Sequence, residues 1–407
     1  MIITWDITYD DEMQGISNIR FTKRKYFTVF IFLLCSVITF SQPYVFKKYI
    51  IDKEIDGCSG LISEDIDGDG NIDIVGTSMN EGHVILWKNN GCGSINWEKI
   101  FIDTTFKAAM YPYTADIDND GTTDVIAGSG AGIVAWWEKD ASNHCSWTRH
   151  VIDSAYPGAH GIYACYMNND SYVDIVASSA DLNSIAWWEN NGLSPVSWMK
   201  HSITHDFHTT QSCMAIDIDN DMDLDILGAS SEDDEIAVWY NTDGSGNSWE
   251  KQLVSDSFDL AHWIYSCDLD NDGDQDILGA ACISGEIAWW ENDGNQPPGW
   301  KKHIIATEFA CAVTVIAGDF DNDDDLDICG TSWYGDEIAI WENPGIPDSD
   351  WIKHSIETNF NGAWPIHAND LDNDGDIDLV AGGDVLNGNG ENPPVSWWEN
   401  QVIKSAK

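Results

Sequence analysis

The sequence predicts an all-β fold, a seven-bladed β-propeller of four-stranded antiparallel blades. A nine-residue acidic string occurs seven times, and the first residues of successive strings lie 51, 50, 51, 51, 51 and 51 positions apart. Each unit holds four short segments of strand-like alternation separated by Gly, Asn and Asp, and no segment has a helical period. Such regularity indicates one structural unit repeated. Seven such units match a closed ring, whereas a linear array would need capping units that the sequence does not show.

The acidic strings set the register of the units. They read DIDGDGNID at 65–73, DIDNDGTTD at 116–124, YMNNDSYVD at 166–174, DIDNDMDLD at 217–225, DLDNDGDQD at 268–276, DFDNDDDLD at 319–327 and DLDNDGDID at 370–378. Each string joins the first two strands, A and B, of its unit. In the fifth unit the predicted strands A to D are Trp263–Asp268, Asp276–Ala280, Glu286–Glu291 and Trp300–Ile305.

The two ends of the repeat region predict how the ring closes. The last unit ends after Trp397-Trp398-Glu399-Asn400 without a strand D, while FKKYII at 46–51 matches the strand D pattern WKKHII at 300–305. The N-terminal segment is therefore expected to complete the last blade. This pairing would remove two exposed sheet edges.

Composition excludes several classes of protein. The 407 residues carry 69 acidic and 19 basic side chains, for a formal charge of −50, together with 43% apolar residues and 21 Trp. So much apolar material argues against a disordered acidic tail, and so negative a field would repel nucleic acid and anionic lipid headgroups. The acidic strings hold 31 of the 69 acids, so much of the charge belongs to the repeat.

The N-terminus resembles a secretory signal. Three basic residues at 23–25 precede an apolar run at 27–40, and a cut is expected ahead of Gln42. We expect residues 1–41 to be an extension with a signal peptide, 42–400 the propeller and 401–407 a tail, with the mature protein secreted or at the cell surface. No later segment is apolar enough to span a membrane. Of the cysteines, Cys282 and Cys311 are the one pair expected to lie in neighbouring loops.

The acidic string has the spacing of a calcium loop. Carboxylates at positions 1, 3, 5 and 9 converge on one point, and Gly at position 6 permits a left-handed turn. Calcium takes six to eight oxygen ligands, and so many like charges within nine residues would repel one another strongly without a cation. The strings therefore predict Ca²⁺ as the cofactor of the intact loops.

The loops and blades resemble the FG-GAP or VCBS repeat propellers, a family whose calcium loops also occur in integrin α-subunits. In the first loop the resemblance implies ligation by the side chains of Asp65, Asp67, Asp69 and Asp73 and by the carbonyl of Asn71. The corresponding ligands in the other intact loops are Asp116, Asp118, Asp120, Thr122 and Asp124; Asp217, Asp219, Asp221, Asp223 and Asp225; Asp268, Asp270, Asp272, Asp274 and Asp276; Asp319, Asp321, Asp323, Asp325 and Asp327; and Asp370, Asp372, Asp374, Asp376 and Asp378.

Three loops depart from the pattern. The third carries Tyr166 and Asn168 at its first and third positions, which predicts a weak or empty site and leaves about six calcium sites. The fourth and sixth carry Met222 and Asp324 in place of Gly, so their turns are expected to be strained while their acids still bind. The cations are expected to stabilise the fold, because metal binding to such loops contributes folding free energy.

Repeated residues are assigned to the scaffold and unrepeated ones to the site. Seventeen Trp recur in frame in strands C and D, which indicates packing between blades. Trp263, Trp333 and Trp364 do not recur, and all three should reach the face opposite the calcium loops. His160 and His262 open two A strands on that face, where another blade carries Gln211.

Two functions follow from this partition. The first is a binding or adhesion module for a glycan or an extracellular protein, using Trp263, Trp333, Trp364, His160, His262 and Gln211 on the face opposite the calcium loops. The alternative is a polysaccharide lyase, with His160 or His262 as base and Tyr163 or Tyr265 as acid. Catalysis is the less favoured of the two, because residues i and i+3 of a regular strand point to opposite faces.

Overall fold

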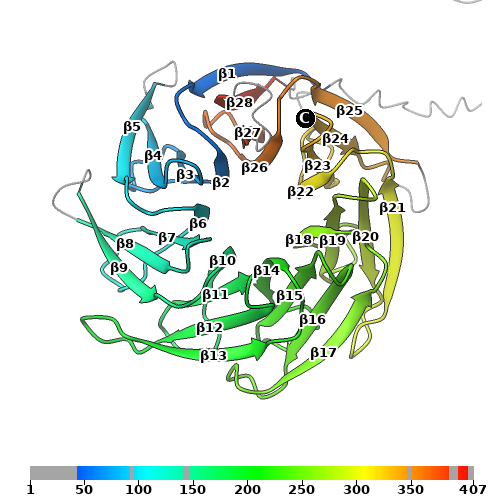
Figure 1. The fold of residues 1–407 in the computed structure, drawn as a ribbon. Helices are drawn as coiled ribbons and strands as arrows, with labels where there is room; N and C mark the ends of the chain where they lie inside the picture. Colours follow the sequence, from blue (N-terminus) through cyan, green and yellow to red (C-terminus); the bar gives the residue numbers. More distant parts are fainter. Residues whose placement is uncertain (1–43, 92–95, 141–145, 346–349, 385–392, 402–407) are drawn as a thin grey trace, which may run out of the picture. The chain divides into compact units, whose positions relative to one another are not determined.

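The computed structural model describes residues 44–91, 96–140, 146–345, 350–384 and 393–401. These residues form seven four-stranded antiparallel sheets arranged as blades around a central axis (Figure 1). No helix in the described part of the chain is long and apolar enough to cross a membrane. The predicted signal segment and residues 402–407 of the predicted tail lie outside the described residues.

The strands follow the predicted order A to D within each blade, with A innermost. Blade 1 is β2 (Cys58–Glu64), β3 (Asp73–Ser78), β4 (His83–Asn89) and β5 (Trp97–Asp103); blade 2 is β6 (Ala109–Ala115), β7 (Asp124–Ser129), β8 (Val134–Lys139) and β9 (Trp147–Asp153); blade 3 is β10 (Ala159–Cys165), β11 (Asp174–Ser179), β12 (Ser184–Asn190) and β13 (Trp198–Thr204); blade 4 is β14 (Thr210–Ile216), β15 (Asp225–Ser230), β16 (Glu235–Asn241) and β17 (Trp249–Ser255).

Blade 5 is β18 (Ala261–Cys267), β19 (Asp276–Ala281), β20 (Glu286–Asn292) and β21 (Trp300–Ala306); blade 6 is β22 (Ala312–Gly318), β23 (Asp327–Ser332), β24 (Glu337–Glu342) and β25 (Ile352–Glu357); blade 7 is β26 (Ala363–Asn369), β27 (Asp378–Gly383), β28 (Val395–Asn400) and β1 (Phe46–Asp52). The predicted closure is confirmed, since β1 pairs antiparallel with β28, with Phe46 opposite Asn400 and Lys48 opposite Trp398.

The recurrent strand C tryptophans pack between blades as expected. Trp137 is buried and meets the ring of Phe106 edge-on at a centroid distance of 4.8 Å, with an interplanar angle of 88°. Trp239 and Trp290 make the same contact with Phe207 and Phe258. Such edge-to-face pairs add to the free energy gained by burying the rings. This repeated contact makes the ring a stable platform for the loops at its two faces.

The A strands differ from the prediction at one point that matters for function. A register shift interrupts the pairing of β10 with β11 between Ala159 and Ile162, and that of β18 with β19 between Ala261 and Trp263. A β-bulge of this kind re-aims the side chains around it. The simple alternation used to separate His160 from Tyr163 therefore does not hold along these strands.

Candidate functional site

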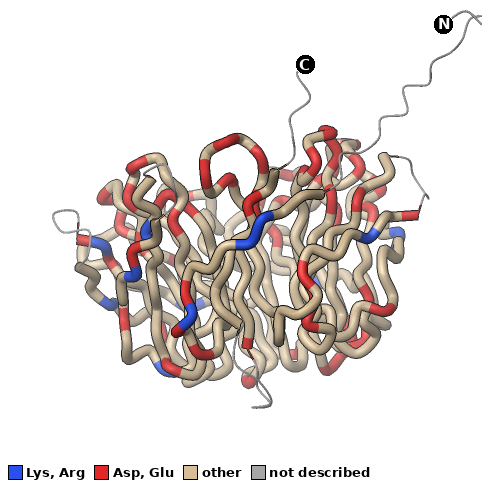
Figure 2. The backbone as a smooth tube through the Cα atoms, turned by 90° about the horizontal axis from the view of Figure 1, so that it is seen from above, with Lys and Arg blue, Asp and Glu red and all other residues tan. Residues whose placement is uncertain are grey.

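The acidic loops lie together on one face of the ring, where Figure 2 shows many of the Asp and Glu residues along one rim. In the fifth loop the carboxylate of Asp268 accepts hydrogen bonds from the backbone N–H groups of Asp272 and Gly273, each at 3.0 Å. Asp276 is fully buried at the end of the same loop and accepts from the N–H of Leu269 at 3.0 Å and of Asn292 at 2.8 Å. The backbone thereby curls the acids toward one point.

The side chains present fit a hard cation. In each of several loops, three carboxylates offer oxygens that lie within 4.8 Å of one another, as in the sets Asp65, Asp67 and Asp73; Asp116, Asp118 and Asp124; Asp217, Asp219 and Asp225; Asp268, Asp270 and Asp276; and Asp319, Asp321 and Asp323. Among the described residues, the buried oxygens Asp67 Oδ1, Asp219 Oδ1 and Asp321 Oδ1 have no hydrogen-bond partner. Buried oxygens without partners cost free energy, so these groups could hold a metal ion of the kind that prefers carboxylate oxygen.

Burial and mutual repulsion raise the pKa of the ninth-position carboxyls. Burial is the largest cause, and it raises the pKa of Asp276 and Asp225 to about 7 and that of Asp124 and Asp378 to about 8. Neighbouring acids such as Asp118 and Asp120 add to the effect at Asp124. A cation in the loop would oppose both causes.

The turns at position 6 show the predicted strain. Met222 and Asp324 adopt φ of 76°, in the left-handed region where Gly121 and Gly273 also lie at 87° and 99°. Met222 is also 84% exposed. Non-Gly residues pay a conformational cost in this region, so the two loops keep the turn at the expense of some stability.

The third loop differs in its turn as well as in its acids. Ser171 at position 6 is not among the described residues with positive φ. Tyr166 is exposed in place of the first Asp, and Asn168 Oδ1 accepts the N–H of Asp170 at 3.1 Å. Weak or absent metal binding by this loop remains a prediction.

The loops also touch one another around the rim. Asn220 Nδ2 of the fourth loop donates to Asp274 Oδ1 of the fifth at 3.0 Å, and Asn169 Nδ2 donates to Asp223 Oδ1 at 2.8 Å. Asn373 Nδ2 of the last loop reaches the carbonyl of Gly70 in the first at 3.0 Å. A change in one loop therefore bears directly on its neighbour.

The opposite face carries the unrepeated aromatics at the mouth of the central channel. We call Met110, Tyr111, His160, His262, Trp263, Trp333 and Trp364 the mouth cluster. The ring of Tyr111 lies 4.6 Å from Trp263 and 5.3 Å from His160, and His160 lies 6.1 Å from His262, all as centroid distances. Tyr111 comes from blade 2, His160 from blade 3, and His262 and Trp263 from blade 5, so side chains of non-adjacent blades meet across the axis of the ring.

The two histidines are held in one tautomer and are neutral near pH 7. His160 Nδ1 donates to the carbonyl of Gln211 at 2.7 Å, and His262 Nδ1 donates to that of Val313 at 2.8 Å. Burial lowers the pKa of His160 to about 3 and that of His262 to about 4. Gln211 therefore contributes its backbone carbonyl here, while its side chain donates to Ser231 Oγ at 3.1 Å.

Only part of the mouth cluster is accessible. Trp364 and His262 are buried, whereas Trp333 and Trp263 are half-buried. Trp333 stacks on both Trp364 and Tyr334, and the latter is 67% exposed. Cys282 and Cys311, the pair expected in neighbouring loops of this face, form a disulfide. A ligand at the mouth would meet Trp333, Tyr334 and Trp263 first.

Tyr163 and Tyr265 lie deeper in the channel. Both line a cavity of about 300 Å³ bordered by the A strands, together with Tyr113 and His367. The rings of Tyr113 and Tyr163 lie 4.8 Å apart. No Lys or Arg is among the described residues that line this cavity, so it offers no cation to neutralise a uronate.

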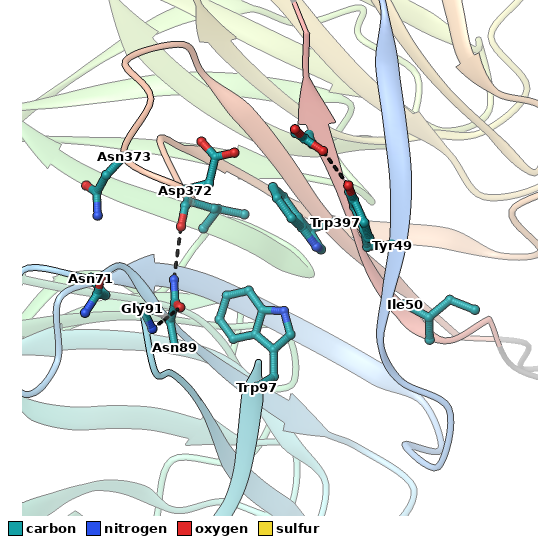
Figure 3. A pocket seen from close by; sticks show the side chains of 11 residues that line it. Tyr49, Ile50, Asn71, Asn89, Gly91, Trp97, Asp372, Asn373 and Trp397 are labelled. Carbon is teal, nitrogen blue, oxygen red and sulfur yellow. Dashed lines mark hydrogen bonds between the residues drawn. The ribbon is translucent and has the colours of Figure 1, made fainter. Parts of the chain in front are cut away.

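A second kind of pocket lies between adjacent blades beside the acidic loops. The pocket between blades 7 and 1 has a volume of about 420 Å³, and the indoles of Trp97 and Trp397 border it (Figure 3). Asp372, Asn373 and Asn89 supply polar groups around it. Trp397 is buried and stacks on Tyr49 at 4.9 Å, while Trp97 is half-buried.

The same pocket recurs at other blade boundaries. Between blades 5 and 6 a pocket of about 560 Å³ is lined by the repeat equivalents Trp351, Trp289, Asp270, Asn271 and Asn343. Between blades 4 and 5 the corresponding loop residues, including Asp219 and Asn220, line a pocket of about 380 Å³ without a Trp. We call these the interblade pockets.

Comparison with known proteins agrees with the blade geometry. The model of the FG-GAP-like repeat matches residues 65–127, 217–279 and 268–330. The chain is a propeller of FG-GAP-like repeats. No curated protein matches its sequence.

Solved structures share the fold of this FG-GAP-like propeller at low identity. An Agrocybe aegerita lectin, described in a study of recognition of non-reducing terminal N-acetylglucosamine, is 18% identical, with a TM-score of 0.52 over 74% of this chain and 81% of the lectin. BBS1N, solved in complex with ARL6DN and soaked with lead, is 7% identical, with a TM-score of 0.61 over 90% and 98%. The same complex soaked with mercury gives 7%, 0.57, 88% and 97%.

Sequence reasoning missed the interblade pockets of this FG-GAP-like propeller. It assigned every recurrent Trp to the scaffold, yet Trp97 and Trp351 at the start of strand D are half-buried and border open pockets. Recurrence was the available signal, because a site repeated in each blade has the same periodicity as a packing contact. Only the exposure of the rings separates the two.

Proposed function

We propose that this chain is a secreted, calcium-stabilised binding module for glycans, and that the interblade pockets are its binding sites. The observation that carries the proposal is the recurrence of one pocket, with two indoles and several amide and carboxylate groups, at different blade boundaries. Aromatic faces stack on the apolar faces of sugar rings, and a few placed polar groups recognise hydroxyls. The lectin with the same fold supports this choice of ligand class.

In this proposal calcium acts on the scaffold. The carboxylates of the intact acidic loops would hold the ions, and these loops also supply one wall of the pockets, as Asp372 and Asn373 do between blades 7 and 1. Calcium would therefore keep that wall in place. Glycan binding should depend on calcium even though the sugar need not touch it.

The mouth cluster is a second candidate surface, favoured by Tyr334, which is 67% exposed and stacks on Trp333. Exposed aromatic surface of this kind suits a protein partner as well as a glycan. The lyase alternative has less support, because the Nδ1 atoms of both histidines are occupied by carbonyls and the described channel lining holds no cation for a uronate.

The test is a glycan array probed with the mature chain in calcium and again after chelation. We expect binding to a limited set of glycans that is lost in EDTA and restored by calcium. The bound glycans should be chemically unchanged after incubation. When the protein is incubated with anionic polysaccharides, no unsaturated uronate should accumulate. Calcium-independent binding, or release of unsaturated products, would contradict the proposal.

A further inference from the structure

The first loop differs from the others in the residues that face it from strand C. After the recurrent strand C Trp, five blades continue with Glu and Asn or with Glu and Lys, namely Glu138-Lys139, Glu189-Asn190, Glu291-Asn292, Glu342-Asn343 and Glu399-Asn400. Blade 1 has Lys88-Asn89 and blade 4 has Tyr240-Asn241. Lys therefore occurs twice in this motif, once at each position. The structure brings both of these lysines to the same loop.

Lys88 reaches the acids of the first loop directly. Its Nζ forms a short ion pair with Asp67 Oδ2 and lies 3.4 Å from Asp69 Oδ2. The side chain of Asp67 is 5% exposed and that of Lys88 is 23% exposed. In blades 2 and 5 a Glu occupies the position of Lys88. Glu138 and Glu291 there add negative charge near the Asp at position 3 of the loop in their own blade, Asp118 and Asp270. Blade 1 thus has a cation, Lys88, at the strand C position where these blades have an acid beside the loop.

Lys139 approaches the first loop from the neighbouring blade. At this position Asn190 and Asn292 donate Nδ2 to the second-position carbonyls of the preceding loops, Ile117 at 2.9 Å and Ile218 at 3.1 Å. Lys139 makes the equivalent bond, from Nζ to the carbonyl of Ile66 at 2.7 Å. The residue is 3% exposed, and it interacts electrostatically with Asp65, Asp67 and Asp73. A buried ammonium needs such partners.

Together the two lysines carry the charge of one divalent cation. The first loop holds four Asp, as does the second, but within the described parts of the chain two ammonium groups approach the first loop alone. We propose that Lys88 and Lys139 replace calcium in the first loop, so that blade 1 folds without a metal ion while the other intact loops require one. This inference rests on calcium as the cation of those loops, which is part of the proposed function.

The consequence is a built-in difference between blades. Blade 1 lies next to the closing blade 7, and its Asn71 and Asn89 line the interblade pocket with Asp372 and Asn373 of the last loop. Removing calcium would release the blade 7 wall of this pocket and leave the blade 1 wall ordered. At low calcium, the boundary between blades 7 and 1 would therefore stay ordered on the blade 1 side.

Counting bound calcium tests the inference. The full mature chain, the double variant Lys88→Glu/Lys139→Asn, and the reciprocal variant Glu138→Lys/Asn190→Lys would each be saturated with calcium and measured by native mass spectrometry. Relative to the native chain, we expect one more ion in the first variant. The reciprocal variant builds the lysine pair on the second loop, so we expect it to bind one fewer.

Hydrogen exchange supplies the second readout on the native chain alone. On chelation, the amides of 268–276 should gain exchange and those of 65–73 should stay protected. Equal calcium counts in the native chain and the first variant, or equal deprotection of the two loops, would overturn the inference and leave the proposed function standing. A native chain that binds no calcium would overturn this inference together with the calcium part of the proposed function.

Discussion

The two faces of the ring follow opposite rules. On the rim of acidic loops, the same positions carry the same chemistry in nearly every blade, down to a buried ninth-position Asp such as Asp124 or Asp276. At the mouth of the channel, equivalent positions carry different residues, including His160, Gln211 and His262. The repeated face binds the ring together and also forms repeated pockets. The varied face forms an aromatic cluster. Because the repeated face forms pockets as well as structural contacts, the recurrence of a residue does not show whether it belongs to the scaffold or to a binding site.

Removal of calcium from the repeated face by a chelator should have the largest effect on stability. A site saturated at about 100 times its Kd adds about 2.7 kcal/mol to the free energy of unfolding, and several loops act together. We expect EDTA to lower the melting temperature by on the order of 10–20 °C and calcium to restore it. Differential scanning calorimetry measures the shift. An unchanged melting temperature would remove the stabilising role of the rim.

Two matched substitutions sharpen the role of single loops. Asp276→Asn in the fifth loop and Asp174→Asn in the third each alter a buried carboxylate that accepts two backbone N–H bonds at 2.8–3.1 Å. Of these two loops, only the fifth has the full acidic set. In saturating calcium we expect Asp276→Asn to lose about 2–3 kcal/mol more than Asp174→Asn.

Urea denaturation with and without EDTA checks this pair. The difference between the two variants should vanish in EDTA, because it arises from the cation and not from the hydrogen bonds. Equal losses in calcium would contradict the prediction that the third loop is weak or empty.

Much of the fold could be predicted from the sequence because the repeat fixes it. The seven occurrences of the acidic string predicted the number of blades. The match of Phe46–Ile51 to strand D predicted the ring closure that the pairing of β1 with β28 confirms. The left-handed turns at Met222 and Asp324 followed from the loss of Gly. These features depend on local spacing, which the sequence shows directly.

The site was less accessible to prediction because it depends on contacts between blades. Alternation placed His160 and Tyr163 on opposite faces of their strand, but the bulge after Ala159 breaks that alternation. Nothing local reveals that Lys139 of blade 2 reaches Ile66 of blade 1. The exposure of Trp97 likewise depends on the neighbouring blade.

The pH dependence of stability gives a smaller effect that separates the two faces. The raised pKa values of Asp276 and Asp124, about 7 and 8, mean that the folded, calcium-free chain binds protons that the unfolded chain has lost above about pH 4. Its stability should therefore fall as pH rises toward 8. The lowered pKa of His262, about 4, acts in the opposite direction, but only below about pH 6.5.

Between pH 6.5 and 8 the carboxyls of the acidic loops should therefore determine how stability changes with pH. We expect the melting temperature in EDTA to fall by a few degrees across this interval and the gain on adding calcium to grow, because the ion binds the deprotonated loop. Thermal melts in matched buffers measure both. A melting temperature in EDTA that rises with pH in this interval would show that the ninth-position carboxyls are not protonated in the folded chain.

The most direct test of the central claim is to count glycan copies at saturation, by native mass spectrometry in calcium, on the native chain and on Trp97→Ala and Trp333→Ala. Trp97 borders an interblade pocket and Trp333 belongs to the mouth cluster, so the two variants compare the two faces. Recurrent sites predict more than one copy on the native chain, one fewer on Trp97→Ala, and an unchanged number on Trp333→Ala. A single copy that Trp333→Ala abolishes and Trp97→Ala leaves intact would contradict the account and place binding at the mouth of the channel.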